Sequence, residues 1–144
     1  MTIPDDVAAF LGRHTRAFLL TRRRDGSPTI HPMTAFFAEG RMTMTTYRKS
    51  AKARNVERDG RAACLVVNGY GKDEVRAVLV RGRGRLRHAA LATLPAAERT
   101  APAERPKVSG DVSARVAARM ASGKRVFLDL EPDRVEPLQR LGTD

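Results

Sequence analysis

The feature of this sequence that most constrains its fold is a series of short strand-like segments separated by tight turns. Residues 16–23 and 29–37 flank an Asp-Gly turn, which is typical of a β-hairpin. A second tight turn at residues 38–40 leads into residues 41–47, whose two alternating sets of side chains predict a third strand. Strands joined by such short turns pair as antiparallel neighbours, so the sequence favours a mainly β fold.

The strand pattern continues to the end of the chain. Residues 59–67 hold the longest apolar run and predict a strand that is buried on both faces. Residues 75–88 predict a longer strand, in which Gly82 and Gly84 indicate a bend or a bulge. Residues 124–139 complete a set of about six strands. Because closure of a sheet removes its exposed edges, we expect a closed antiparallel barrel.

A few helices interrupt the strands. Residues 4–13 predict a short first helix with acidic residues in its first turn, and a basic helix is expected to begin at Ser50. Residues 89–122 are rich in alanine and predict a helical excursion before the last strand, with residues 113–120 as its clearest helix. The length of 144 residues favours a single domain spanning 1–144.

The charge of the chain restricts its partners. The net charge is +11, and residues 41–87 carry thirteen Lys or Arg against four Asp or Glu. Such an excess predicts an anionic partner: a nucleic acid, a phosphorylated cofactor or an acidic metabolite. Two tyrosines, five phenylalanines and no tryptophan offer few surfaces for base stacking, and no nucleic-acid-binding signature is present. A nucleic acid is therefore the least favoured of the three.

Cysteine content and hydropathy point to a cytoplasmic protein. Cys64 is the single cysteine, so no internal disulfide can form, and its apolar surroundings predict a small core residue. The histidines and Cys64 show no metal-ligand spacing, so we expect no metal. The first residues are acidic where a signal peptide would be basic. The longest apolar run is far below the roughly 20 residues that a membrane helix needs.

The region around Ser50 predicts a phosphate site. If the helix begins at Ser50, the serine hydroxyl caps it, and the amides of Ala51 and Lys52 point out of the helix end. The helix dipole and the Lys52 ammonium favour an anion at the same place. Arg48 and Lys49 flank this position. An ordinary capped helix with a solvated basic face would explain the same spacing.

Three segments together resemble a known family. They read "LLTRRRDGSPTIHPMTAFF", "GRMTMTTYRKSAKARNVERDGRAACLVV" and "LVRGRGRLRH". In this order they resemble the flavin-binding split β-barrel family, the pyridoxamine 5'-phosphate oxidase-like proteins, over roughly residues 15–88. The stretch "KSAKARNVERDGR" is most similar to the actinobacterial branch that uses the deazaflavin coenzyme F-420. The resemblance implies a six-stranded antiparallel split β-barrel, the FMN-binding split-barrel fold.

The resemblance also implies a cofactor site. Ser50 and Lys52 would hold the cofactor phosphate, with Thr45 and Thr46 lining the same pocket. Arg54 would reach the phosphate, and Asn55 would be a structural hydrogen-bonding residue. The ring system would lie along the strand formed by His31, Pro32 and Met33. Because Pro32 lacks a backbone N–H, we expect its strand to lie at an edge, at a bulge or against a ligand.

The implied function is that of a coenzyme F-420-dependent oxidoreductase, which transfers a hydride to an unsaturated small-molecule substrate. The family resemblance further implies a homodimer that completes the pocket. The side chains that could donate a proton in the matched region are Tyr47, Tyr70 and His31. Alternatives are an FMN-dependent oxidoreductase of the same fold, a non-catalytic cofactor carrier or sensor, and a basic nucleic-acid-binding protein.

Two further features bear on these alternatives. The chain lacks the tryptophan-containing C-terminal motif of true pyridoxamine phosphate oxidases, so we do not expect that activity. A row of arginines at every second position of residues 81–87 would share one face of a strand. This row is either a solvated face balanced by Glu98, Glu104 and Asp111, or a surface for the poly-glutamate tail of the deazaflavin. Its members are Arg81, Arg83, Arg85 and Arg87.

Overall fold

The computed structural model describes residues 1–68, 76–88 and 110–138. The elements are α1 (Asp5–Arg13), β1 (Arg16–Arg22), β2 (Pro28–Thr34), β3 (Phe36–Ala38), β4 (Arg41–Tyr47), α2 (Ala51–Arg58), β5 (Arg61–Val67), β6 (Ala77–Arg87), α4 (Gly110–Ala121) and β7 (Arg125–Leu138). The mainly β class is confirmed, with seven strands in the described part of the chain instead of six. The extra strand arises because the segment expected as one strand is divided at Ala35, whose amide donates to the carbonyl of Thr15 at 2.8 Å.

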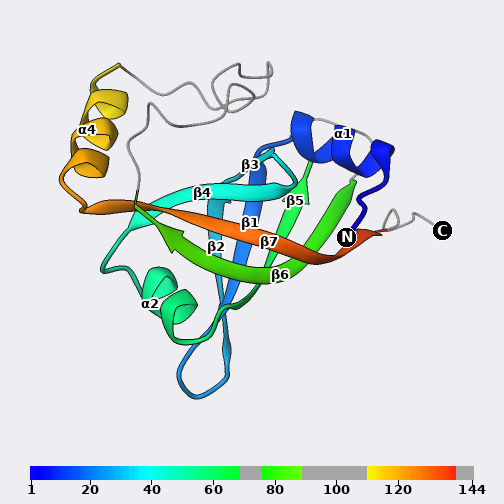
Figure 1. Ribbon diagram of the computed structural model, residues 1–144, viewed down its shortest axis with the longest axis horizontal. Helices are drawn as coiled ribbons and strands as arrows, with labels where there is room; N and C mark the ends of the chain where they lie inside the picture. Colours follow the sequence, from blue (N-terminus) through cyan, green and yellow to red (C-terminus); the bar gives the residue numbers. More distant parts are fainter. Residues whose placement is uncertain (69–75, 89–109, 139–144) are drawn as a thin grey trace.

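All seven strands belong to one antiparallel sheet with the order β2-β1-β5-β6-β7-β4-β3. The two end strands, β2 and β3, are consecutive in the chain and are separated only by Ala35. The sheet must therefore curl until its two ends meet, as Figure 1 shows. No hydrogen-bonded ladder among the described residues joins the ends. The barrel is thus split, which confirms the split barrel that the family resemblance implies and corrects the closed barrel that the strand pattern alone predicts.

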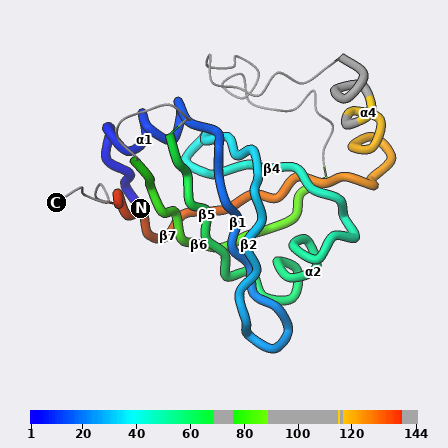
Figure 2. Tube along the Cα trace, turned by 180° about the vertical axis from the view of Figure 1, so that it is seen from behind, coloured from blue at the N-terminus to red at the C-terminus, as the bar shows by residue number. Residues whose placement is uncertain are grey.

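Two helices cover opposite ends of the curled sheet (Figures 1 and 2). At one end, α1 buries Val7 and Leu11, which share one helix face because they are four residues apart. At the other end, α2 buries Val56 in the same apolar core, which the inward side chains of the strands complete. No helix in the described residues is long and apolar enough to span a membrane.

The bulge that the glycines predict is present where β6 and β7 pair. The register shifts between Arg81 and Gly82, and the additional residue is Asp133 on β7. A Cβ atom at Gly82 would lie only 1.9 Å from the carbonyl oxygen of Glu131. Glycine is therefore required because the β7 backbone passes against β6 at this point. The bulge lets these two long strands follow the curvature of the sheet.

The outer face of β2, β1 and β5 is apolar and uncovered within the described residues. In β5, Cys64 and Val66 are buried, whereas the outward Leu65 is only half-buried, so the predicted burial of both faces is wrong. Ile30 on β2 is 62% exposed. Because β2 pairs only with β1, Pro32 lies on an edge strand, as its missing N–H predicts.

Two other sequence predictions concern the core and the excursion. Cys64 is a core residue as expected, and its burial raises the pKa of the thiol to about 12. The helix expected at residues 113–120 is confirmed as the longer α4. The rest of the predicted excursion, residues 89–109, lies outside the described residues, as does Tyr70.

Candidate functional site

The N-terminus of α2 has the capped geometry that the sequence predicts. Ser50 is the N-cap, and its Oγ accepts a hydrogen bond from the amide of Ala53 at 3.2 Å. The Ser50 and Thr46 hydroxyls share a second hydrogen bond of 3.0 Å, which fixes the helix end to β4. The first backbone bond of the helix runs from the amide of Arg54 to the carbonyl of Ser50. The amides of Ala51 and Lys52 therefore point out of the helix end.

His31 on β2 lies within the electrostatic influence of this helix end. Burial lowers the pKa of its imidazole most, and the positive charges of Lys52 and Arg23 lower it further. His31 Nδ1 is buried and has no hydrogen-bond partner among the described residues. Lys52 is half-buried in the first turn of α2, and within the part of the chain that the structure describes it forms no ion pair. The structure thus brings Ser50, Lys52, Thr46 and His31 together, with positive potential and an unsatisfied ring nitrogen.

The strand that carries His31 presents alternate side chains to this site. His31 and Met33 are half-buried on the inner face of β2, and Met33 packs against the core. Pro32 points to the opposite face and is exposed. A ligand beside this strand can therefore meet the side chains of His31 and Met33, whereas Pro32 can offer it only its backbone carbonyl.

Thr45 and Thr46 do not line the same pocket, so that expectation is wrong. Consecutive residues of a strand point to opposite faces. Thr46 is buried on the inner face beside Ser50. The Thr45 hydroxyl lies on the outer face, where it accepts from Arg125 Nη2 at 3.0 Å. Only Thr46 belongs to the site at the helix end.

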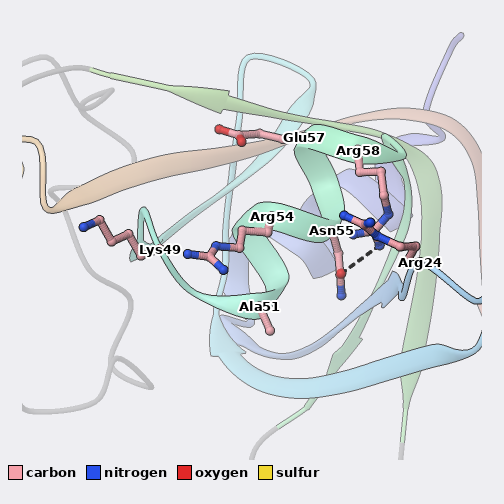
Figure 3. Close-up of a pocket in the computed structure, with 7 residues that line it drawn as sticks. All are labelled: Arg24, Lys49, Ala51, Arg54, Asn55, Glu57 and Arg58. Carbon is pink, nitrogen blue, oxygen red and sulfur yellow. Dashed lines mark hydrogen bonds between the residues drawn. The ribbon is translucent and has the colours of Figure 1, made fainter.

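Arg54 is separated from Lys52 by the helix itself. Positions two apart on a helix point in nearly opposite directions, and Arg54 is exposed on the outward face of α2. There it lines a cavity of about 770 Å³ (Figure 3). The sequence analysis did not predict this cavity. The sequence feature that could have indicated this cavity is the spacing of Ala51, Arg54 and Arg58, which places these residues on one helix face.

Asn55 is a structural residue, as the resemblance implies. It is buried, and its Nδ2 donates to Thr21 Oγ1 on β1 at 3.1 Å. Its Oδ1 accepts from Arg58 Nη2 at 2.9 Å. The Thr21 hydroxyl also shares a hydrogen bond of 2.7 Å with Thr29 on β2. This network holds α2 against the hairpin that carries His31.

Tyr47 lies away from the His31 side of the sheet. It is exposed, with the Cζ atoms of Arg125 and Arg119 at 4.6 and 5.3 Å from its ring centroid. Arg119 also donates a hydrogen bond to the Tyr47 hydroxyl. Tyr70, the third predicted proton donor, lies outside the described residues. Of the two described donors, His31 is the one that lies near Lys52.

The arginine row is also remote from this site. Arg81, Arg83 and Arg85 are exposed on the outer face of β6, as the two-residue period predicts. Arg81 pairs with Glu136 at 3.6 Å, and Arg87 Nε donates to Asp129 Oδ2 at 2.6 Å. Within the described residues, the acids that pair with Arg81 and Arg87 therefore lie on β7. The side chains of Glu98, Glu104 and Asp111 lie outside the described part of the structure.

Comparison with solved structures supports the fold. A conserved hypothetical protein from Mycobacterium tuberculosis superposes with a TM-score of 0.70 at 23% identity, over 100% of this chain and 93% of the other. A protein named F-420 reductase gives 0.66 at 22% identity, over 93% and 98% of the two chains. An FAD-binding protein from Mesorhizobium loti gives 0.62 at 13% identity, over 95% of each chain.

Sequence comparison identifies the family. No curated protein matches this sequence significantly. The family described as pyridoxamine 5'-phosphate oxidase matches residues 3–139, which include every strand of the sheet and the capped helix α2. Because this match spans nearly the whole chain, the protein belongs to the pyridoxamine 5'-phosphate oxidase family.

Proposed function

We propose that the protein is a coenzyme F-420-dependent oxidoreductase that transfers a hydride to an electron-poor double bond of a small molecule. The observation that supports a cofactor site is that Lys52, beside the Ser50 cap of α2, lies close enough to His31 on β2 for its charge to lower the pKa of the imidazole. The similarity of "KSAKARNVERDGR" to the actinobacterial branch favours the deazaflavin over FMN. Family membership is consistent with flavin-type redox chemistry.

The helix end fits a phosphate group. The outward amides of Ala51 and Lys52 and the Lys52 ammonium provide donors and positive charge. Ser50 Oγ already accepts from Ala53, but the hydroxyl proton of Ser50 is free for a phosphate oxygen when Thr46 donates to Ser50. The donors and the charge of these residues are therefore those that a phosphate site needs.

The inner face of β2 fits a ring system with a polar edge. Met33 offers an apolar surface, and the unpartnered Nδ1 of His31 offers one hydrogen bond. Because the pKa of His31 is lowered, its imidazole is neutral at pH 7 and can donate or accept. A bound reduced deazaflavin supplies the hydride, while the protein positions the reactants and limits the access of water.

We further propose that the protein acts as a homodimer. The outer face of β2, β1 and β5 presents Ile30, Leu20 and Leu65 in neighbouring strands, and none of these side chains is fully buried. Exposed apolar surface of this kind marks interaction sites. A second copy of the chain would cover this face, which includes β2, the edge strand that carries His31.

An FMN-dependent oxidoreductase is the second candidate. A mononucleotide carries one terminal phosphate, which the end of α2 suits equally well. The arginine row gives the deazaflavin tail little support, because it faces outward and its end members are paired with acids. A non-catalytic carrier or sensor would use the same cofactor site without turnover.

A direct titration tests these proposals. Cofactor-free protein is titrated with F-420 and with FMN at low salt, and cofactor fluorescence is followed. We expect saturable binding of one cofactor per chain, mutual competition and tighter binding of F-420. Equal or tighter binding of FMN would establish the second candidate, and absence of both would reject a cofactor role. Oxidation of bound reduced F-420 by quinones or enones separates an enzyme from a carrier.

A further inference from the structure

The outward face of α2 carries a continuous basic surface. The cavity of about 770 Å³ lies between α2 and the β1–β2 turn. A second cavity of about 660 Å³ lies between the start of α2 and the turn that precedes β7. The two cavities share Lys49, Arg54 and Glu57, so they adjoin. We call the combined surface the α2 groove. Its basic residues are Arg24, Arg48, Lys49, Arg54, Arg58 and Lys124.

The helical period explains how this surface forms beside the cofactor site without being part of it. Arg54 and Arg58 are four residues apart and point outward, whereas Lys52 and Val56 lie toward the inner face. Figure 3 shows Lys49 and Arg54 extending from one end of the helix, and Arg24 and Arg58 at the other. The positive charge is thus spread along the groove and is not focused at one point.

The charges in the groove are largely uncompensated. The side chains of Arg24, Lys49 and Arg54 form no ion pair or hydrogen bond within residues 1–68, 76–88 and 110–138, and the same holds for Arg48 and Lys124. Arg58 donates only to neutral acceptors, at 2.6 and 2.9 Å. Glu57 is the only acid lining the described groove, and its carboxylate points away from Arg24 and Arg58 in Figure 3.

Some arginines elsewhere in the described structure pair with nearby acids. Arg61 pairs with Asp59 at 3.0 Å, and Arg87 pairs with Asp129 at 2.6 Å. The pairing with Arg61 lowers the pKa of Asp59 to about 2. The α2 groove differs because several like charges lie close together without such partners. An anionic ligand would relieve their mutual repulsion.

We propose that the α2 groove binds a small molecule that carries several carboxylate or phosphate groups in series. Each cavity has the size of an ordinary small-molecule site. The spread of the cations suits a chain of anionic groups better than a single phosphate. Because the side chains are exposed, each contact contributes little, and binding requires several contacts and falls with added salt. The proposal does not depend on the cofactor proposed for Lys52.

A nucleic acid fits the groove less well. Single-stranded nucleic acids are bound by cations together with aromatic rings on which the bases stack. Tyr47 is the aromatic residue that lines the described groove. Its ring is in contact with the guanidinium groups of Arg125 and Arg119, which compete with a base for its faces.

Calorimetry with defined anions tests the proposal. The full chain is titrated with inorganic tripolyphosphate and citrate, and with inorganic phosphate and acetate as single-group controls. We expect tripolyphosphate to bind at least tenfold more tightly than phosphate, with the difference shrinking at high salt. Equal affinity for tripolyphosphate and phosphate would overturn the proposal.

Matched variants locate the binding. The double variant R24E/R54E should weaken tripolyphosphate binding at least tenfold. The double variant R83E/R85E, which changes the net charge equally on the outer face of β6, should weaken it less than threefold. Lys52→Ala should have less than a twofold effect. Similar losses of affinity in both double variants would show that binding depends only on net charge. A large loss in Lys52→Ala would place the anion at the cofactor site. Either result would overturn the proposal, as would binding of oligo(dT) in preference to tripolyphosphate.

Discussion

Asn55 of α2 donates a hydrogen bond from Nδ2 to Thr21 Oγ1 of β1 at 3.1 Å, across 34 residues of sequence. Both residues are buried, so neither polar group can turn to water. The same hydroxyl of Thr21 is bonded to Thr29 on β2. This relationship fixes the helix that carries Lys52 relative to the strand that carries His31.

Substitution of Asn55 by alanine should destabilise the fold. Removing the amide takes one hydrogen-bond partner from the buried Thr21 hydroxyl and one from the Arg58 guanidinium, which costs about 1–3 kcal/mol of the free energy of unfolding. Urea unfolding followed by circular dichroism measures this loss. Glu57→Ala, on the exposed face of the same helix, should change stability by no more than about 0.5 kcal/mol. An equal effect of the two substitutions would contradict the proposed role of the network.

Lys52→Ala should weaken cofactor binding with little change in folding. Loss of a charge-assisted hydrogen bond to phosphate corresponds to about 1.5–3 kcal/mol of binding free energy. The fluorescence titration of F-420 or FMN measures this difference, with Arg83→Ala as a control on the far side of the sheet. Unchanged affinity in a folded Lys52→Ala variant would remove Lys52 from the proposed phosphate site.

The ionisation of His31 should report on Lys52. Burial and then Lys52 lower the pKa of the imidazole from 6.5, so the stability associated with neutral His31 is present above this value and is lost as the pH falls. NMR titration of the ring proton should give a pKa below 6.5 that rises in Lys52→Ala. A phosphate bound beside Lys52 should also raise it. Insensitivity of the His31 pKa to Lys52→Ala would show that the two groups are not neighbours.

Gly82→Ala should lower the free energy of unfolding more than most substitutions that add one methyl group. The new methyl carbon would lie 1.9 Å from the Glu131 carbonyl oxygen, so β6 or β7 must shift. We expect a loss of at least about 2 kcal/mol, as in other overpacked cores. Gly12→Ala is the matched control, because it lies in α1 with no atom within 4 Å of the new methyl group. That variant should gain up to about 1 kcal/mol in thermal or urea unfolding.

The apolar outer face should mediate self-association. Light scattering at micromolar concentration should give the mass of a dimer, because covering Ile30, Leu20 and Leu65 removes apolar surface from water. Ile30→Lys should shift the protein toward the monomer without unfolding it, since this side chain is already exposed in the single chain. A monomeric wild-type protein with cofactor bound would contradict the dimer.

The sequence predicts best what depends on neighbouring residues. The cap at Ser50 and the bulge near Gly82 follow from local chemistry, and both are confirmed. The pairing of Asn55 with Thr21 depends on how α2 packs across the sheet, which no local pattern specifies. The division of the second strand at Ala35 likewise depends on curvature of the whole sheet.

The candidate site was also only partly predictable from the sequence. Ser50 and Lys52 could be placed on the first turn of a helix from spacing alone, and the structure confirms that placement. The separation of Thr45 from Thr46 follows from the two-residue period of strands, which the family resemblance overrode in the prediction. The α2 groove depends on residues from three separate segments, so its cavities could not be predicted before the fold was known.

The position of β7 has a consequence for the order of folding. This strand comes last among the described elements, yet it lies between β6 and β4 in the sheet. The β3–β4 hairpin has no other strand through which to join the remaining strands by a ladder. The ladder that joins Thr46 and the rest of β4 to the other strands can therefore form only after residues 125–138 have left the ribosome. Such long-range pairing predicts slow folding and makes completion of the curled sheet a late, post-translational event.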